Sequence, residues 1–204
     1  MLQPLIATEM KEFEKYACDN FDITLDNMMQ NAGRAVFDVV MQEISSKRVL
    51  VVVGKGNNGG DALVTAELLK EEGIEVMVSK IENPKIQMPN SKFDLIIDAI
   101  FGFSLKGDPR PPADKIINQM NESSIPILSV DVPSGLDAES GLPMTPTIKA
   151  TYTVTLGMPK IGLDSHTEYV GKLYLGDLGI PQKAYQKLDI YTSIFSGKTY
   201  IALD

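Results

Sequence analysis

Glycines, amides and carboxylates that could bind a phosphate, hold a cation or move a proton gather in three short motifs of this 204-residue sequence. The first motif runs from Gly54 to Asp61 and reads GKGNNGGD, the second begins at Asp98, and the third begins at Asp131. Glycines allow a backbone to approach a ligand closely, and a carboxylate can exchange a proton with a substrate. The motifs therefore point first to a phosphorylated small molecule as the ligand.

The elements on either side of the first motif predict how it would bind an anion. Arg48–Val53 is a short run rich in β-branched residues, typical of an interior parallel strand. After the glycines, Ala62, Ala66 and Leu69 recur on one face of an expected helix. A helix start offers free N–H groups and the positive end of its dipole to an anion. A strand, a glycine loop and a helix in this order therefore predict a phosphate-binding turn.

Residues that are missing from the motif exclude one kind of phosphate-binding loop. Gly54, Gly56 and Gly59 fit the pattern G-x-G-x-x-G, but no Gly-Lys-Ser/Thr follows, which excludes the nucleoside triphosphatase loop. Glu82, near the end of the next expected strand, would be the ribose-binding acid of a dinucleotide fold. The glycine triplet alone is not specific, and a tight turn without a ligand is the alternative, although four glycines exceed what a turn needs.

The amino-acid composition limits the classes to which the protein can belong. A hydrophobic content of 44% suits one compact domain over residues 1–204, and the net charge of −8 argues against a nucleic-acid partner. The single cysteine, Cys18, cannot form an internal disulfide, which fits a reducing, cytoplasmic location. No apolar run is long enough to span a membrane, and the acidic start is unlike a targeting peptide. We therefore expect a cytoplasmic protein without a membrane partner.

Expected strands and helices alternate along the chain. Two helices begin after Thr8 and Thr24, and a further one covers residues 112–122. The core faces of the first two helices consist of Met10, Phe13, Ala17, Met28, Ala32, Ala35 and Val39. The expected strands are 48–53, 74–79, 93–97, 125–130, 151–156 and 172–175. The alternation predicts an α/β fold: a Rossmann-like, doubly wound, mostly parallel sheet in a three-layer αβα sandwich, with two N-terminal helices.

Carboxylates follow two of the expected strands directly. Asp98 comes after the strand at 93–97, and Asp131 comes after the strand at 125–130. Ligands of such sheets bind beyond the carboxyl ends of the strands, where the glycine motif also lies. One carboxylate at a strand end is equally well explained as a helix cap or a solvated loop residue. Agreement among three strand ends favours a ligand site.

Four blocks give a specific resemblance. GKGNNGGD, DAIFG, VDVPSGLD and PKIGL, at residues 54–61, 98–102, 130–137 and 159–163, resemble the NAD(P)H-hydrate epimerase family, also called the YjeF N-terminal domain. The segments at 31–34, 169–171 and 177–181 are similar too. One departure is Ala62, where the family usually has a further glycine, so the loop is expected to be narrower or stiffer here.

The resemblance implies an isomerase that repairs hydrated NADH and NADPH (NADHX and NADPHX), in which water has added across the nicotinamide ring. It would interconvert the R and S epimers at C6, and a fused or separate dehydratase would then use one of them. The family resemblance also implies a homodimer. Inversion of this carbinolamine runs either through an iminium ion or through ring opening, and both routes need proton transfer and charge stabilisation. Asp131 is the expected catalytic residue, as general acid or base and as electrostatic partner of the cation.

The resemblance also implies the remaining site residues. Those expected to bind the substrate are Asn57, Asn58, Gly59, Gly60, Asp61, Gly102, Phe103, Ser104, Leu105, Lys106, Gly107, Asp108 and Asp131. The expected cofactor is a potassium ion held by Asn58, Asp98 and Ser134, whose oxygen-only donors suit a hard cation. Zinc is not expected, because Cys18 and His166 are the only residues of their types. Lys160 is either part of the pocket or a solvated surface charge.

Three alternatives of other classes stay open at this point. The glycine triplet would suit an NAD(P)-dependent oxidoreductase, although no tyrosine is followed four residues later by a lysine. A non-catalytic scaffold relative could share the fold, but a scaffold has no need of the intact glycine motif, Asp98, Asp131 and Ser134. A generic nucleotide-binding module would share the fold as well, because a fold alone does not specify function.

Overall fold

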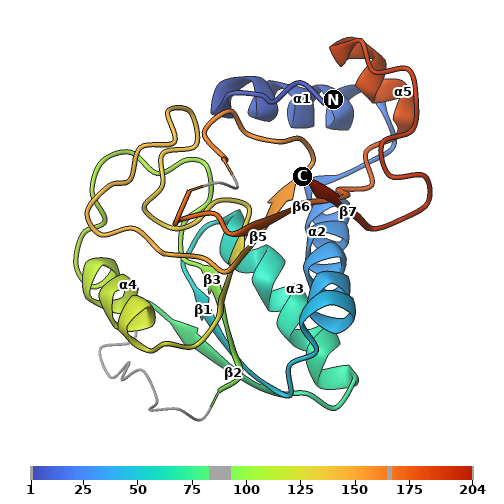
Figure 1. The fold of residues 1–204 in the computed structure, drawn as a ribbon. Helices are drawn as coiled ribbons and strands as arrows, with labels where there is room; N and C mark the ends of the chain where they lie inside the picture. The colour runs from blue at the N-terminus through green and yellow to red at the C-terminus, as the bar shows by residue number, and fades with distance from the viewer. Residues whose placement is uncertain (1, 83–92, 165–166, 204) are drawn as a thin grey trace.

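A single seven-stranded sheet forms the centre of the protein, whose computed structural model describes residues 2–82, 93–164 and 167–203 (Figure 1). The strand order is β2-β1-β3-β4-β5-β6-β7, and every pair is parallel except the last, in which β7 runs antiparallel to β6. The strands are β1 Arg48–Val53, β2 Glu75–Lys80, β3 Leu95–Ala99, β4 Ile127–Val130, β5 Tyr152–Leu156, β6 Lys172–Gly176 and β7 Tyr200–Leu203. The α/β, mostly parallel fold expected from the sequence is confirmed.

Helices cover both faces of the sheet unequally. They are α1 Ala7–Asn20, α2 Leu25–Val39 with a π-helical turn Val40–Ile44, α3 Asn57–Glu71, α4 Ala113–Glu122, and α5 Gln182–Tyr185 with a 3₁₀ turn Gln186–Leu188. Because side chains alternate along a strand, Val49 and Val51 belong to the buried cluster that includes residues of α1, α2 and α3, whereas Leu50 and Val52 belong to the cluster that includes residues of α4. Figure 1 shows α4 apart from α2 and α3. No helix in the described ranges is long and apolar enough to cross a membrane.

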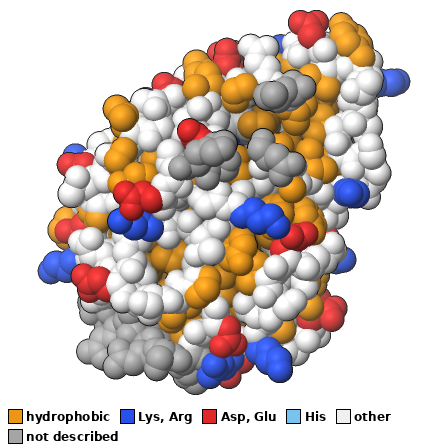
Figure 2. All heavy atoms as spheres, in the orientation of Figure 1, with side chains coloured by type: hydrophobic (Ala, Val, Ile, Leu, Met, Phe, Trp, Pro, Cys, Tyr) orange, Lys and Arg blue, Asp and Glu red, His pale blue; other side chains and the backbone are white. Residues whose placement is uncertain are grey.

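The molecular surface carries charges of both signs. On the face shown in Figure 2, basic and acidic side chains lie interspersed, with hydrophobic side chains between them. Exposed apolar side chains include Leu25 at the start of α2 and Ile161 in the loop after β5. The apolar surface therefore reaches solvent at separate places, as is usual for folded proteins.

Local signals located several boundaries well. Strand β1 spans the residues expected, and α2 begins after Thr24, whose hydroxyl oxygen accepts a hydrogen bond from the Asn27 amide at 3.1 Å. The first helix begins at Ala7, slightly before the expected start after Thr8, because the Glu9 carboxylate accepts a bond from the Ile6 amide at 3.0 Å. The core residues expected on α1 and α2 are all buried.

The glycine motif differs from the expected loop. Helix α3 already begins at Asn57, so that residues 57–61 form its first turns, and only Gly54, Lys55 and Gly56 connect it to β1. An added Cβ atom at Gly59 would overlap the Gly54 carbonyl oxygen. Glycine at position 59 thus allows the helix start to lie directly against the strand end, which brings the first amides of α3 to the edge of the sheet.

Two strands depart from the sequence-based expectation. Strand β3 extends through Ala99, so Asp98 lies within the strand rather than after it. Strand β7 was not expected at all, and it pairs with β6 through a register that includes Leu175 and Ile201. A four-residue strand whose partner lies far away in the sequence has no strong local pattern, which explains why the sequence alone did not indicate it.

Candidate active site

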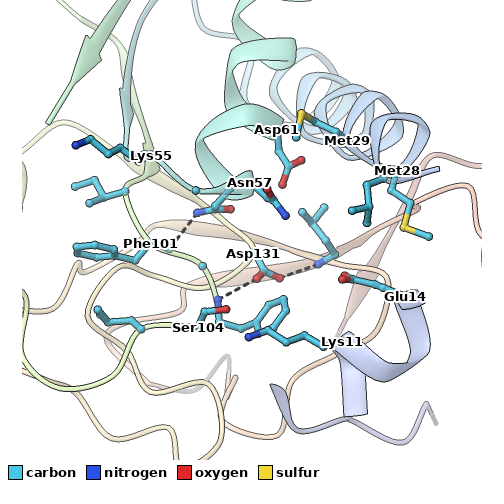
Figure 3. A pocket seen from close by; sticks show the side chains of 18 of the residues that line it. Lys11, Glu14, Met28, Met29, Lys55, Asn57, Asp61, Phe101, Ser104 and Asp131 are labelled. Atoms are coloured by element: carbon cyan, nitrogen blue, oxygen red, sulfur yellow. Dashed lines mark hydrogen bonds between the residues drawn. The ribbon is translucent and has the colours of Figure 1, made fainter. Parts of the chain in front are cut away.

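A cavity of about 1300 Å³ lies between α1, α2, the start of α3 and the loop after β3, at the carboxyl edge of the sheet (Figure 3). Typical pockets for drug-sized ligands occupy roughly 300–1,000 Å³, so this cavity is large enough for a bigger ligand. The expected site residues that line it are Asn57, Asn58, Asp61, Gly102, Phe103, Ser104, Leu105, Lys106 and Asp131. Gly59, Gly60, Gly107 and Asp108 are not among its lining residues.

Asp131 enters the cavity because the backbone turns sharply where β4 ends. Its φ angle is 66°, in the left-handed region that residues other than glycine rarely adopt. Its amide still donates to the Val154 carbonyl at 2.8 Å, so the turn begins directly at the last bond of the ladder. Aspartate tolerates this conformation better than most residues, and the turn carries its side chain out of the sheet.

The Asp131 carboxylate forms a buried ion pair with Lys160. The Lys160 Nζ lies 2.6 Å from the Asp131 Oδ1 and also donates to the Leu156 carbonyl at 2.6 Å. Lys160 is 2% exposed and Asp131 is 4% exposed, so the interpretation of Lys160 as a solvated surface charge is wrong. The amides of Phe103 and Leu156 donate to Asp131 at 3.3 and 3.4 Å. Such a pair persists in a protein interior only when its polar atoms are satisfied in this way.

Two further carboxyl groups lie near this pair. Asp61 projects from the start of α3, and Glu14 projects from α1 (Figure 3). Burial raises the pKa of Asp61 to about 8, with added contributions from the charges of Asp131 and Glu14 and an opposing one from Lys160. Burial also raises the pKa of Glu14, against the opposing charge of Lys160. Carboxyl groups with shifted pKa values in a cavity are typical of a catalytic site.

Glu14 was not expected from the sequence. It lies on α1 four residues after Met10 and next to Phe13, on the side of the helix that these residues bury. A charged residue on an otherwise apolar helix face is a usable signal, because burial of a charge is costly unless it has a purpose or a partner. That position could therefore have indicated a role in a cavity beside α1.

A second polar cluster includes Asn58, which lines the cavity, and Asp98 and Ser134, which do not. Asp98 is fully buried and accepts hydrogen bonds from the Ser129 hydroxyl at 2.8 Å, the Ser134 amide at 2.9 Å and the Ser134 hydroxyl at 2.6 Å. Burial raises its pKa, whereas these bonds lower it. The Asn58 Nδ2 donates to the Phe101 carbonyl at 2.9 Å, while the Asn58 Oδ1 is buried without a partner. The Ser134 hydroxyl also lies 3.4 Å from the Phe101 carbonyl oxygen, so Asn58 and Ser134 meet at this carbonyl, and Asp98 is joined to them through Ser134.

The loop from Gly102 to Asp108 forms one wall of the cavity. An added Cβ atom at Gly102 would lie 3.2 Å from the Asp131 Oδ2, so glycine keeps the space above this carboxylate open. The Lys160 Nζ lies 5.5 Å from the centre of the Phe103 ring, within the range of a cation–π contact. Asp108 accepts a bond from the Thr145 amide at 2.8 Å, which ties the end of the loop to a neighbouring segment.

The remaining residues singled out in the sequence include two glycines of α3 and two charged residues on the cavity wall. The amides of Gly59 and Gly60 donate to the Gly56 carbonyl, and an added Cβ atom at Gly60 would lie 2.7 Å from Met29 on α2. Glu82 lines the cavity, and one of its oxygens lies 3.9 Å from the Lys55 Nζ. Lys106 is exposed at the rim. His166 lies outside the described residues.

The cavity region differs from a site of clustered His, Cys, Asp or Glu metal ligands. Within the described ranges, no group of three or more His, Cys, Asp or Glu side chains is placed to hold a metal ion. The cluster around Phe101 is of another kind, because its donors are amide, hydroxyl, carbonyl and carboxylate oxygens. Donors of this kind suit hard cations rather than zinc.

Comparisons with known proteins agree with one another. An NAD(P)H-hydrate epimerase of Plasmodium knowlesi is 33% identical, over 91% of this chain and 72% of the relative. One of Lentilactobacillus buchneri is 31% identical, over 88% of this chain and 96% of the relative. The bifunctional NAD(P)H-hydrate repair enzyme Nnr of Moorella thermoacetica is 33% identical over 87% of this chain, which spans 40% of that protein.

A solved structure and a family model show the same similarity. The crystal structure of yeast ynu0, YNL200c, matches with a TM-score of 0.85 and 28% identity, covering 99% of this chain and 100% of the yeast chain. Residues 25–92 and 79–162 match the model of the family described as YjeF-related protein N-terminus. These two matches include α2, the glycine motif, both aspartate motifs and the first four residues of the PKIGL block. The chain belongs to the YjeF-related protein N-terminus family.

Proposed function

We propose that this protein is an NAD(P)H-hydrate epimerase, an isomerase that interconverts the R and S epimers of NADHX and NADPHX. The observation that carries the proposal is the buried Asp131–Lys160 pair on the wall of a cavity of about 1300 Å³. Relatives with this name cover nearly the whole chain at about one-third identity. The unity of residues 1–204 as one functional domain is supported by the single sheet.

The chemistry requires a charge beside the reacting carbon. C6 of the hydrate carries a hydroxyl group next to the ring nitrogen, so loss of that hydroxyl leaves an iminium cation. Water then returns to the other face of the planar ring. Asp131 is the carboxylate that we place at this carbon, because its two oxygens are fixed by Lys160 and Phe103 while Gly102 leaves space above them. A preorganised negative charge lowers the energy of a cation that forms there.

The start of α3 supplies the group that would bind the pyrophosphate. Asn57 and Asn58 occupy the first positions of the helix, where backbone amides have no acceptor within the helix. The amides of Gly59 and Gly60 already donate to Gly56, so we assign anion binding to the two asparagine amides and the helix dipole. Lys106, exposed at the cavity rim, adds a positive charge that a phosphate can reach.

A potassium ion fits the polar cluster of Asn58, Asp98 and Ser134. The buried Asn58 Oδ1 has no hydrogen-bond partner in the described part of the chain. The Phe101 carbonyl accepts hydrogen bonds from the Asn58 amide group and the Ser134 hydroxyl, and that hydroxyl also donates to Asp98. Asp98 forms no ion pair with a lysine or arginine of the described residues, so a bound cation would compensate its buried charge. When bound, the ion would supply a fixed positive charge that holds the Asn58 side chain and the start of α3.

The wider assembly is also part of the proposal. We expect a homodimer, as the resemblance to the family implies. We also expect a dehydratase, separate or fused, to consume one epimer, because a bifunctional relative carries additional length beyond this region. A cytoplasmic location stays a prediction of the single cysteine and the acidic composition. Sedimentation analysis of the purified protein tests the dimer directly.

The activity is tested by equilibrating purified S and R hydrates. We expect the wild-type protein to accelerate the interconversion well above the spontaneous rate, which is measured without protein and subtracted. Asp131→Asn retains the size of the side chain but removes the charge, and it should slow the enzymatic reaction by roughly 10²–10⁴-fold. A wild-type rate equal to the spontaneous rate contradicts the function, whereas a fully active Asp131→Asn variant contradicts only the role of Asp131.

A further inference from the structure

We propose that Asp61 is the proton donor of the epimerisation, and that Asp131 is the fixed carboxylate that stabilises the cation. This division of roles rests on the proposed function and adds a catalytic residue to it. It follows from a difference between two carboxyl groups on the wall of the same cavity. One of them has partners for both oxygens, and the other has none.

The surroundings of Asp61 leave its carboxyl group free to react. Asp61 is 8% exposed and lines the cavity, yet its side chain forms no hydrogen bond or ion pair with the described residues. Figure 3 shows its carboxyl group directed from the start of α3 into the cavity that Asp131 also lines. Buried polar groups are normally hydrogen-bonded when their role is structural. An unpartnered carboxyl group facing a cavity is therefore available to a ligand.

The helix holds Asp61 in this position by its backbone. The Thr65 hydroxyl donates to both the Asp61 carbonyl and the Gly33 carbonyl, at 3.1 and 3.0 Å. An added Cβ atom at Gly33 would lie 2.8 Å from the Asp61 carbonyl oxygen, so α2 and α3 pack closely here. Close packing of two helices fixes the direction in which the Asp61 side chain leaves the backbone.

Asp131, in contrast to Asp61, has hydrogen-bond donors at both of its carboxylate oxygens. Lys160 and two backbone amides donate to its oxygens, so it is held as an acceptor. A proton added to this carboxylate would compete with the ammonium group that it already binds. Asp131 is thus suited to stabilise a cation and poorly suited to deliver a proton.

Charges around Asp61 favour its protonated form. The groups that face it are Glu14 from α1, Asp131 from the end of β4 and Lys160 from the loop after β5, and burial is the largest influence. Other charged side chains on the cavity wall are Lys11, Lys15, Asp26, Lys55, Glu82 and Lys106. With its pKa at about 8, Asp61 carries a proton at neutral pH and can act as an acid.

The proton and electron movements balance with this assignment. The Asp61 carboxyl proton passes to the C6 hydroxyl, the C6–O bond breaks, and water leaves while the ring nitrogen lone pair forms the C=N bond of the iminium. Water then adds to the other face of C6, and the electron pair of the C=N bond returns to nitrogen. The proton released by this water passes to the solvent, and solvent water returns a proton to the Asp61 carboxylate. No oxidant, reductant or further reactant is consumed.

The experiment compares Asp61→Asn with the wild type in the equilibration of S and R hydrates. Asparagine keeps the shape of the side chain but has no acidic proton, so we expect kcat to fall by roughly 10²–10⁴-fold. Asp22→Asn is the matched control, because Asp22 is exposed and is not among the cavity-lining residues, and it should keep the wild-type kcat. Binding of NADP⁺, measured by calorimetry, should be similar in all three proteins.

A pH profile separates an acid from a structural residue. Wild-type kcat should decline above about pH 8, where Asp61 loses its proton, and Asp61→Glu should restore part of the activity and an alkaline decline. Carbon NMR of protein labelled at its aspartate carboxyl groups should show one signal that titrates near pH 8 and is missing in Asp61→Glu. This titration remains decisive if the Asn variant does not fold.

The outcomes are distinct. A wild-type protein that does not accelerate the reaction overturns the proposed function. An active wild type together with a folded Asp61→Asn variant of equal kcat overturns the role of Asp61 alone. A signal of Asp61 that titrates at the ordinary value for aspartate overturns it as well.

Discussion

The Lys160 ammonium group lies 2.6 Å from the Asp131 carboxylate, with both side chains almost completely buried, although the two residues are 29 positions apart in the sequence. The pair joins the strongly turned end of β4 to the loop after β5. It fixes the carboxylate at the cavity wall, whereas the Asp61 side chain, on the neighbouring helix, forms no hydrogen bond or ion pair with the described residues. The proposed roles of Asp131 as the fixed charge and Asp61 as the proton donor therefore depend on tertiary contacts.

Removing the ammonium group should destabilise the fold. We expect Lys160→Met to lower the free energy of unfolding by roughly 3–5 kcal/mol, because Asp131 would be left buried without its partner. The control is Lys149→Met, since Lys149 and Glu168 also lie 2.6 Å apart but are more than half exposed. That change should cost at most about 1 kcal/mol. Urea denaturation measures both, and a Lys160→Met variant as stable as Lys149→Met would contradict the buried-pair argument.

Replacement of Asn58 should alter the response to potassium. Asn58→Ala removes the unpartnered buried oxygen, so the potassium concentration that gives half of the maximal activity should rise, or the dependence should disappear. Activity is measured against potassium chloride at constant ionic strength, with choline as the replacement cation. Asn57→Ala, at the adjacent position of α3, serves as the control and should retain the wild-type dependence. An unchanged dependence in Asn58→Ala argues against the proposed ligand.

Two glycines should respond differently to alanine. At Gly102 the new methyl group would lie 3.2 Å from the Asp131 Oδ2, within the space assigned to the reacting ring, so kcat/KM should fall at least roughly tenfold. At Gly60 it would meet only the flexible end of Met29, so stability should change slightly and NADP⁺ binding should persist. Calorimetry and the equilibration assay compare the variants, and equal kinetics at both positions would contradict the placement of the ring.

Stability should depend on pH through Asp61. Its pKa is raised from 3.8 to about 8 in the folded protein, so between these values the folded state keeps a proton that the unfolded state releases. Stability therefore falls as pH rises through this window, by at most about 1.4 kcal/mol per pH unit. Asp61→Asn lacks this penalty and should gain stability over the wild type from about pH 4 to about pH 8.

Urea denaturation at a series of pH values, in potassium-free buffer, measures this difference. Above about pH 8 the gap between Asp61→Asn and the wild type should stop growing, because both states of the wild type have then lost the proton. Asp22→Asn, at an exposed position, should follow the wild type throughout. A constant gap between Asp61→Asn and the wild type across the window would show that Asp61 is not perturbed.

Sequence alone determined the elements whose signals are local. The β-branched run defined β1 at Arg48–Val53, the cap at Thr24 located the start of α2, and the spacing of Ala62, Ala66 and Leu69 gave the buried face of α3. These features depend on neighbours within one turn or one strand, so a short window contains their cause. The order of strands and helices along the chain then indicated the parallel sheet and the edge at which a ligand binds.

Tertiary structure alone decided the chemistry at that edge. The left-handed turn at Asp131, the buried position of Lys160, and the approach of Glu14 and Asp61 to them depend on segments far apart in the sequence. Strand β7 likewise formed only where β6 offered a free edge. Charge, burial and hydrogen bonding set which carboxyl group keeps its proton, and each of these is a property of the surrounding chain rather than of the residue itself.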